Sequence, residues 1–172
     1  MPQLVLPDLK YKDSYLEAVK EYQAEDLPNY RGLDPEKLQN DFPGYLEQLQ
    51  RESRGEGLPA DYVPHTVFWL VEGDQYLGRL DIRHILNDFL HHQAGHIGYD
   101  VRPTQRRKGY GNLELKLVLE KAKELGLQEV LITCDVDNVG SNKIIRQNGG
   151  VLENTIEIDA GKRAKNRYWI KS

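Results

Sequence analysis

Apolar side chains recur at helical spacing near the start of the chain. Leu16, Val19 and Tyr22 follow one another three residues apart, which is the spacing of one helical face. Ser14 and Glu17 stand in the order of a capping box, in which a serine caps a helix and a glutamate three residues later bonds back to it. We therefore expect a first helix that is capped by Ser14.

A second helical stripe follows Asp34 and Pro35. Aspartate is a favoured helix cap, and proline suits the first helical position because no N–H is needed there. Pro43 interrupts the stripe and predicts either a kink or two short helices, since proline removes a helical hydrogen bond. The apolar positions of this stripe are Leu38, Phe42, Tyr45 and Leu49.

Strand-forming residues become frequent from position 66. Residues 66–72 are rich in β-branched and aromatic side chains, as is typical of a strand. The Gly-Asp pair at 73–74 supplies a turn, so residues 75–85 are predicted to be the returning strand of a hairpin. A first short strand is expected earlier, over residues 3–6.

The second half of the chain alternates strands with helices. A helix over 109–125 is predicted to end at Gly126, because glycine is the usual residue after a helix end. Residues 130–136 form an apolar run typical of a strand that is covered on both faces. The buried stripe of the long helix is expected to be Leu115, Val118, Leu119, Ala122 and Leu125. The remaining predicted elements are strands over 95–101, 151–158 and 166–170 and a helix over 141–148.

This order of elements predicts an α/β fold. The strand–helix–strand unit from 95 to 136 implies a parallel pair joined by a right-handed crossover. The early hairpin and the two C-terminal strands imply antiparallel flanks. We therefore expect a mixed sheet of about seven strands covered by about four helices.

Composition narrows the class of protein. With 172 residues, the chain is expected to form one domain over 1–172. Its 39% hydrophobic and 29% charged residues are typical of a soluble globular protein, and a net charge of −4 gives no field that attracts nucleic acid. The single cysteine, Cys134, excludes an internal disulfide, and inside an apolar strand it is expected simply to pack. No signal peptide or membrane-spanning run is apparent, so we expect a cytoplasmic protein with no nucleic-acid or membrane partner.

The loop between the strand at 95–101 and the long helix carries the candidate chemistry. Four of the seven residues 102–108 are basic and none is acidic, which is unusual in a chain of negative net charge. Gly109 and Gly111 open the helix, where glycine lets a ligand approach the backbone closely. The first N–H groups of a helix have no internal partner, and together with the helix dipole they favour an anion such as a pyrophosphate.

Other phosphate-binding motifs fit less well. A Walker loop needs the sequence G-x-x-x-x-G-K-S/T, which this chain lacks. The dinucleotide fingerprint needs a third glycine where Glu114 stands, and a carboxylate there does not suit a pyrophosphate. A solvated surface loop at the start of a helix is the plain alternative.

The segment Arg106-x-x-Gly109-x-Gly111 resembles the acetyl-CoA loop of the GNAT superfamily of N-acetyltransferases. The preceding Val101-x-Pro103 is placed as in that family. The downstream pair Asn138 and Ser141 resembles the family's N-x-x-S at the end of the next strand, and Gly149 matches the glycine that ends the following helix. The predicted order of strands and helices is also that of the family.

The resemblance implies that acetyl-CoA is a co-substrate held by the middle of the chain. In this family the strand before the loop splays from its parallel neighbour, and the pantetheine arm lies in the gap. It would pair with the main chain of Tyr99, Asp100 and Val101. The loop N–H groups would hold the pyrophosphate, and Asn138 and Ser141 would lie by the pantetheine, while Lys143 reaches a CoA phosphate or stays solvated. The implied loop residues are Arg106, Arg107, Lys108, Gly109, Tyr110, Gly111 and Asn112.

The implied reaction is direct attack of a neutral primary amine on the thioester, with the N–H of Val101 polarising the carbonyl. Many members carry a tyrosine seven residues after the asparagine, where this chain has Ile145, and some carry a glutamate five residues before it, where this chain has Thr133. The general acid and base are therefore unknown. The candidates by placement are Asp135, Tyr168, His96 and Tyr99. Asp135 alternatively bonds to loop amides.

Histidines and charges outside the motif have plain alternatives. A polar loop holding His91 and His92, followed by His96, has a spacing that zinc sites use, but with no cysteine nearby we expect no metal. Three residues of one strand, Arg79, Asp81 and Arg83, share a face that lines either an acceptor cleft or solvent. The basic residues Lys162, Arg163, Lys165 and Arg167 form a charged hairpin turn, or a patch for an acidic partner or the adenosine phosphate.

Three functions are weighed. The first is an acetyl-CoA-dependent N-acetyltransferase, the second a non-catalytic acyl-CoA-binding module, and the third a nucleotide-binding α/β domain. The sequence leaves the acceptor open among a small amine, an amino acid, an antibiotic, a protein N-terminus and a lysine side chain. It also leaves open a homodimer through the C-terminal sheet edge.

Overall fold

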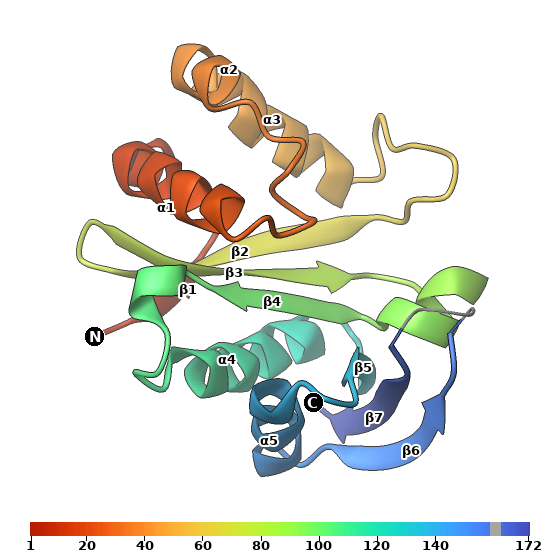
Figure 1. The fold of residues 1–172 in the computed structure, drawn as a ribbon. Coiled ribbons are helices and arrows are strands. Elements are labelled where there is room, and N and C mark those ends of the chain that lie inside the picture. Colours follow the sequence, from red (N-terminus) through yellow and green to blue (C-terminus); the bar gives the residue numbers. More distant parts are fainter. Residues whose placement is uncertain (159–162) are drawn as a thin grey trace.

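A computed structural model describes residues 1–158 and 163–172 (Figure 1). The helices are α1 (Lys12–Ala24), α2 (Pro35–Asn40), α3 (Phe42–Ser53), α4 (Tyr110–Glu124) and α5 (Val139–Gln147). The strands are β1 (Gln3–Val5), β2 (His65–Glu72), β3 (Gln75–Arg83), β4 (Ile97–Val101), β5 (Glu129–Asp135), β6 (Val151–Ile156) and β7 (Lys165–Lys171). This order confirms the predicted sequence of strands and helices.

The strands form two sheets instead of one. β1, β2, β3 and β4 pair in that order, and β5, β7 and β6 form a second sheet, with antiparallel pairing throughout. β4 and β5 were predicted to be a splayed parallel pair within one mixed sheet; among the described residues they are not paired and belong to separate sheets, which corrects that part of the prediction. Just before β4 an isolated bridge joins Gly95 to Ile132 of β5, beside the bond from the His96 main-chain N–H to the Leu131 carbonyl at 2.7 Å. The seven strands and the α/β class are as predicted.

Helices cover both faces of the larger sheet (Figure 1). α1, α2 and α3 lie on one face, and α4 lies on the opposite face together with α5 and the smaller sheet. Two hydrophobic clusters result. The first lies under α1–α3 and is rich in aromatic residues, among them Tyr15, Tyr22, Phe42 and Trp69; the second joins α4 to both sheets. None of the described helices is long and apolar enough to cross a membrane.

The predicted interruption near Pro43 is confirmed. α2 and α3 are separate helices that meet at Asp41, whose side chain caps α3 by accepting from Gly44 N–H. Asp34 caps α2 as expected. The capping box at Ser14 is wrong, because α1 already begins at Lys12, directly after a turn at Leu9–Tyr11. The Ser14 hydroxyl bonds instead to tertiary partners, which are described below.

Smaller differences appear in the second half. Leu125 was predicted to be buried but is 43% exposed, because α4 ends at Glu124 and the chain turns away at Gly126, with a φ of 84°. The predicted polar loop with two histidines contains a π-helical turn at Leu90–Ala94. His91 and His92 are exposed there, whereas His96 is buried between β4 and β5.

Candidate functional site

The start of α4 presents main-chain donors that the helix leaves unbonded. Gly109 is its N-cap with a φ of 86°, a left-handed conformation that favours glycine, and no side chain caps the helix. The first main-chain bond back to the cap runs from Leu113 N–H to the Gly109 carbonyl, so the N–H groups of Tyr110, Gly111 and Asn112 lack helical acceptors. A Cβ added at Gly109 would meet no atom within 4 Å, so the space before these donors is open. An anion fits this end of the helix.

Gly109 and Gly111 serve different purposes. Gly111 is buried, and an added Cβ would lie 3.0 Å from Cδ1 of Ile144, so this glycine lets α5 pack closely against α4. A hydrogen bond of 2.9 Å from Asn148 to the side chain of Asn112 also joins the two helices. The expectation of close ligand approach therefore applies to Gly109, whereas Gly111 is needed for packing.

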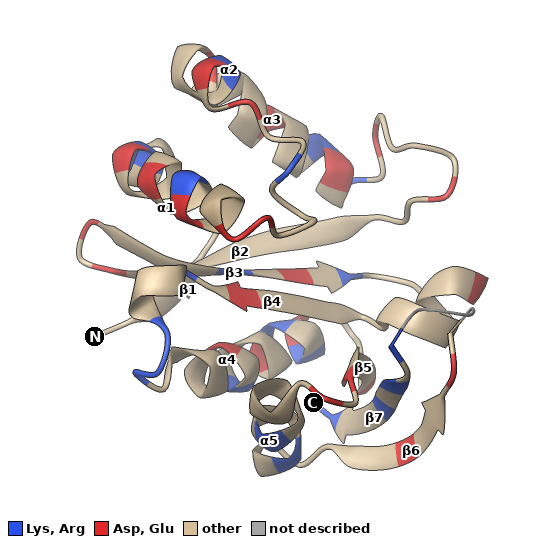
Figure 2. Ribbon diagram, viewed as in Figure 1, with Lys and Arg blue, Asp and Glu red and all other residues tan. Residues whose placement is uncertain are grey.

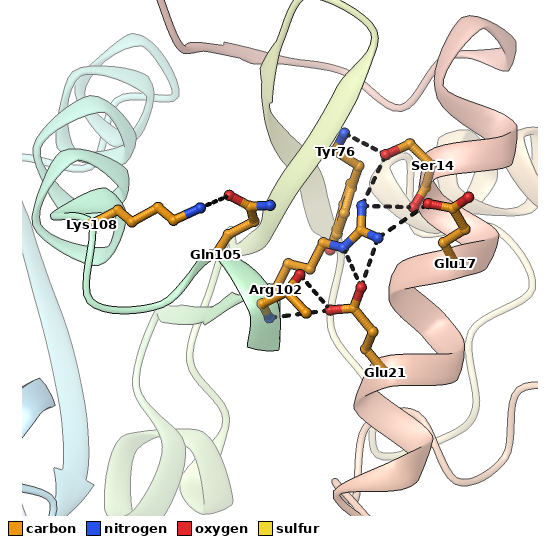
Figure 3. Close-up of polar contacts among 8 residues, drawn as sticks. Ser14, Glu17, Glu21, Tyr76, Arg102, Gln105 and Lys108 are labelled. Carbon is orange, nitrogen blue, oxygen red and sulfur yellow. Dashed lines mark hydrogen bonds and ion pairs between the residues drawn. The ribbon is translucent and has the colours of Figure 1, made fainter.

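Two of the four loop arginines and lysines anchor the loop to α1, whose acidic residues are coloured red in Figure 2; Figure 3 shows the contacts of Arg102. Arg102 is 8% exposed, and its guanidinium contacts Glu21 at 2.7 Å, Glu17 at 3.2 Å and the Ser14 hydroxyl at 3.1 Å. Arg106 forms an ion pair with Glu25 at 2.7 Å. These contacts fix the loop at the end of β4.

The other two basic side chains are available to a ligand. Among the described residues, Lys108 bonds only to the neutral side-chain amide of Gln105, at 2.8 Å (Figure 3). Arg107 is exposed, with a φ of 64°, and among the described residues it has no ion pair or side-chain hydrogen bond. Free cations beside unbonded helical N–H groups suit phosphate oxygens. Within the predicted motif, Arg102 and Arg106 thus anchor the loop, whereas Arg107 and Lys108 are available to a ligand.

β4 offers a second row of free donors. Arg102 N–H donates to the Leu77 carbonyl on β3, so alternation along an antiparallel strand directs the N–H groups of Asp100 and Gly98 to β3 as well. Those of Tyr99 and Val101 point to the other edge, where no ladder to β5 exists among the described residues. Of the three main-chain residues implied for pantetheine, Tyr99 and Val101 thus present donors to the gap, and Asp100 does not.

Asn138 and Ser141 stand at the start of α5. The Asn138 side chain caps this helix by accepting from Ser141 N–H at 3.0 Å. Their neighbour Asn142, which no sequence motif indicated, is buried and joins α5 to β5 and β7. Its amide donates to the carbonyls of Asp135 and Asn138, and its oxygen accepts from Asn166 and from the Tyr168 hydroxyl, the latter at 2.6 Å. Lys143 beside it is exposed.

The candidate acids and bases have different surroundings. Asp135 pairs with Lys165 at 2.9 Å rather than with loop amides, and the Tyr168 hydroxyl is committed to Asn142. Ile145 is fully buried and Thr133 donates to the Gln93 carbonyl.

The Tyr99 hydroxyl is buried without a hydrogen-bond partner among the described residues. Burial raises the pKa of Tyr99 to about 12, while the nearby Ser141 lowers it, so this phenol stays protonated.

A cavity of about 730 Å³ lies beside this region, between α1, α3 and β3. Arg79, Asp81 and Arg83 line it, so the interpretation of this strand face as a cleft wall is favoured over a solvated face. Asp81 is shared by the two arginines, at 3.1 Å from Arg79 and 3.3 Å from Arg83. Asp81 also extends over β4, since a Cβ at Gly98 would lie 2.7 Å from its Oδ1. Asp81 therefore lies between the cavity that it lines and the strand β4, whose far edge borders the gap.

Other sequence features do not join this site. No group of three or more possible metal ligands occurs in the described part of the chain. The C-terminal basic residues are paired individually: Arg163 with Asp137, Lys165 with Asp135 and the buried Arg167 with Glu153, while Lys162 lies outside the described residues. Cys134 is buried, and burial raises its pKa to about 11, which does not favour a nucleophile.

A two-strand gap that leads into an anion site at a helix start defines an acyl-CoA-dependent transferase fold. A family model described as "Acetyltransferase (GNAT) domain" matches residues 15–151. The chain belongs to this family and is a GNAT-type acetyltransferase, as the motif predicted. No curated protein matches the sequence.

Solved structures agree in fold at low identity. The microcin C7 self-immunity acetyltransferase MccE, in complex with acetyl-CoA and AMP, is 18% identical with a TM-score of 0.71, covering 99% of this chain and 92% of that one. The ribosomal-protein α-N-acetyltransferase RimL, in complex with coenzyme A, is 17% identical with a TM-score of 0.71, covering 99% and 93%. Mycobacterium smegmatis RimJ is 16% identical with a TM-score of 0.71, covering 99% and 82%. These likenesses concern the fold.

Proposed function

We propose that residues 1–172 act as one domain that transfers the acetyl group of acetyl-CoA to a primary amine. The observation that carries the proposal is the continuous set of unbonded main-chain donors. They are the first three N–H groups of α4 and those of Tyr99 and Val101 along the gap. Acceptor groups in this order, a pyrophosphate and then amide carbonyls, occur in coenzyme A. MccE is in complex with acetyl-CoA and RimL with coenzyme A, which supports the same donor here.

Each part of the site has a task in this reaction. Acetyl-CoA supplies the acetyl group as a thioester; the neutral amine would attack its carbonyl carbon, the C–S bond would break, and coenzyme A would leave as its thiol. Arg107, Lys108 and the start of α4 hold phosphate oxygens. The N–H groups of Tyr99 and Val101 orient the donor and polarise the acetyl carbonyl. Asn138 and Ser141 border the pantetheine region.

A base must remove a proton from the incoming ammonium group before it can attack as the neutral amine. Asp100 is placed for this task because its side chain lies on the cavity face of β4, where Asn29 contacts it at 3.5 Å. Burial raises the pKa of Asp100, although Arg79 opposes the shift, and a raised pKa makes a carboxylate a better base near neutral pH. Asp135 and Tyr168 stay candidates, each with a hydrogen bond that it would have to give up.

Titration calorimetry with acetyl-CoA, with ATP and NAD as controls, tests the donor. Selective binding of acetyl-CoA is expected, whereas binding of ATP or NAD with equal affinity would favour a nucleotide-binding domain. A thiol-release assay with a panel of primary amines then tests the chemistry. Acetyl-CoA binding without turnover of any amine would favour the non-catalytic acyl-CoA-binding module instead.

A further inference from the structure

The floor of the cavity beside β4 is formed by charged residues of β3. Acetyl transfer itself does not require these charges. Its volume of about 730 Å³ lies within the range of pockets for drug-sized ligands and exceeds what a simple amine requires. Arg79 lies on this floor, and Tyr15, Tyr30 and Tyr45 form the wall on the helical side. A charged group under an aromatic wall implies a ligand with more than one kind of chemical group.

Arg79 keeps most of its hydrogen-bonding capacity. Its side chain is 19% exposed and makes a single hydrogen bond among the described residues, from Nη1 to Oδ1 of Asp81 at 3.1 Å. A guanidinium has five N–H donors in a plane, so four remain for a ligand. Burial disfavours its charge, but Asp81 holds the pKa of Arg79 above its ordinary value. The group is therefore a permanent cation with donors to spare.

Arg83 differs from Arg79 in this respect. It uses Nη1 on the Gly95 carbonyl at 3.2 Å and Nη2 on Asp81 at 3.3 Å. Asp81 thus neutralises one of the two arginines, and Arg83 is held by the backbone near the end of the cavity. Arg79 and Arg83 both line the cavity, and Arg79 has four N–H donors left where Arg83 has three.

A second side-chain donor without a hydrogen-bond partner in the described residues lies near Arg79. Tyr30 lines the same cavity, is 1% exposed, and has a hydroxyl without a hydrogen-bond partner in the described residues. Its ring is stacked on Tyr22 with centroids 3.9 Å apart, which fixes its position. Burial raises the pKa of Tyr30 although Arg79 opposes the shift, so the hydroxyl remains a donor. This hydroxyl is closed off from the cavity, so Arg79 is the donor that the acceptor oxygens of a ligand reach directly.

Negative charge lies immediately beside these donors. Asp100 is the cross-strand partner of Arg79 on β4, and Asp81 lies over Gly98 on the same strand. Both carboxylates are therefore nearer to the gap than Arg79 is. A ligand with an oxyanion on Arg79 would place an adjacent ammonium group by the two aspartates.

We infer that the cavity binds an amine that also carries an oxyanion, with an α-amino acid as the simplest case. Arg79 holds the oxyanion, and the amine lies at Asp100, where the proposed acetyl transfer needs it. This inference rests on the proposed function for the fate of the amine, but the binding of the oxyanion can be measured without it.

The test compares amino acids with the amines that lack their carboxylate. The pairs are phenylalanine and 2-phenylethylamine, leucine and 3-methylbutylamine, and lysine and 1,5-diaminopentane, measured by calorimetry on the intact protein and by thiol release with acetyl-CoA. At least one amino acid is expected to bind about tenfold more tightly than its amine, with KM lower by a similar factor. The phosphonate analogue of phenylalanine shows whether the oxyanion is a carboxylate or a phosphate-like group.

Arg79→Gln is expected to abolish that difference, and Arg79→Lys to retain part of it if the glutamine variant fails to fold. Arg54→Gln, which removes an exposed arginine paired with Glu56, is the matched control and should leave the difference unchanged. Equal affinity for all three pairs in the wild type, or an unchanged difference in Arg79→Gln, overturns the inference. Binding of an amino acid without turnover of any amine would instead count against the proposed function alone.

Discussion

The ring of His96 bonds the main-chain N–H of Leu131 at the point where β4 and β5 part. Its Nδ1 accepts this hydrogen bond at 2.9 Å, while the His96 N–H donates to the Leu131 carbonyl at 2.7 Å. The side chain thus takes the place that a strand carbonyl would have in a continued ladder. Beyond it the N–H groups of Tyr99 and Val101 stay free for a ligand. An Nδ1 that accepts carries no proton, so the ring is neutral with its hydrogen on Nε2.

This arrangement predicts an acid-sensitive step in stability. Burial first, and then the charges of Arg83 and His91, lower the pKa of His96 from 6.5 to about 4. Because the unfolded chain binds this proton at a higher pH than the folded protein does, the stabilisation is complete above pH 6.5 and is lost progressively as the pH falls from 6.5 to about 4. His96→Asn keeps an acceptor but cannot titrate. Between pH 6.5 and 4 the wild type should lose up to about 3 kcal/mol of unfolding free energy relative to this variant. Urea denaturation at several pH values measures the difference, and parallel curves would contradict the role of the ring.

Gly109→Ala tests the anion site against a matched control. Gly109 and Gly126 both have left-handed φ values, of 86° and 84°, with open space around an added Cβ. Alanine at either position should lower the free energy of unfolding by about 1 kcal/mol, because the backbone conformation is strained. Only Gly109→Ala should also weaken acetyl-CoA binding, by about tenfold, since its methyl group stands where the backbone meets the ligand. Calorimetry on both variants separates these effects, and an equal loss of affinity would remove the site from Gly109.

Local sequence rules predicted the elements well where the signal lay within a few residues. Asp34 and Pro35 start α2, and the break near Pro43 separates α2 from α3, because caps and proline act on the adjacent backbone. Ser14 failed as a cap since its hydroxyl accepts from Tyr76 N–H and from Arg102 on distant elements. The split of the sheet depends on a histidine ring meeting a strand 35 residues away, which no local pattern reveals.

The sequence predicted where the candidate site lies, but not which of its residues hold the loop in place and which are available to a ligand. The motif located the start of α4, yet only the fold shows that Arg102 and Arg106 pair with acids of α1 some 81 residues away. The acceptor cavity combines β3 with tyrosines of the N-terminal helices, so its composition depends on tertiary packing. One signal was available and missed: Glu114 is a charged residue next to Leu115 on the buried face of α4.

The different roles of Arg102 and Arg107 can be tested by the same substitution. Arg102→Gln removes a buried guanidinium that contacts Ser14, Glu17 and Glu21, so it should lower the free energy of unfolding by about 2 kcal/mol. Arg107→Gln should change stability by less than about 0.5 kcal/mol, because the side chain is exposed without a partner in the described residues. Its acetyl-CoA affinity should fall severalfold, most clearly at low salt. Calorimetry at two ionic strengths and urea denaturation measure both quantities, and a destabilised Arg107→Gln would show that its charge has a structural role.

Glu114 predicts a loss of stability toward alkaline pH. The residue is fully buried on α4 against Gly78, and neither carboxyl oxygen has a hydrogen-bond partner in the described part of the chain. Burial, followed by the charge of Asp100, raises its pKa well above the ordinary value of 4.5. A raised pKa in the folded state means that the unfolded chain releases this proton first. The folded form should therefore lose about 1.4 kcal/mol per pH unit above 4.5, until Glu114 itself ionises.

Glu114→Gln removes this titration while keeping the size of the side chain. The variant should match the wild type near pH 4.5 and become progressively more stable than it toward pH 8. Glu120→Gln, at an exposed position of the same helix, is the control and should show no such trend. Urea denaturation of the three proteins across this range gives the comparison. If the wild type and Glu114→Gln have equal free energies of unfolding up to pH 8, the carboxylate is ionised and solvated within the fold, contrary to its position beneath Gly78.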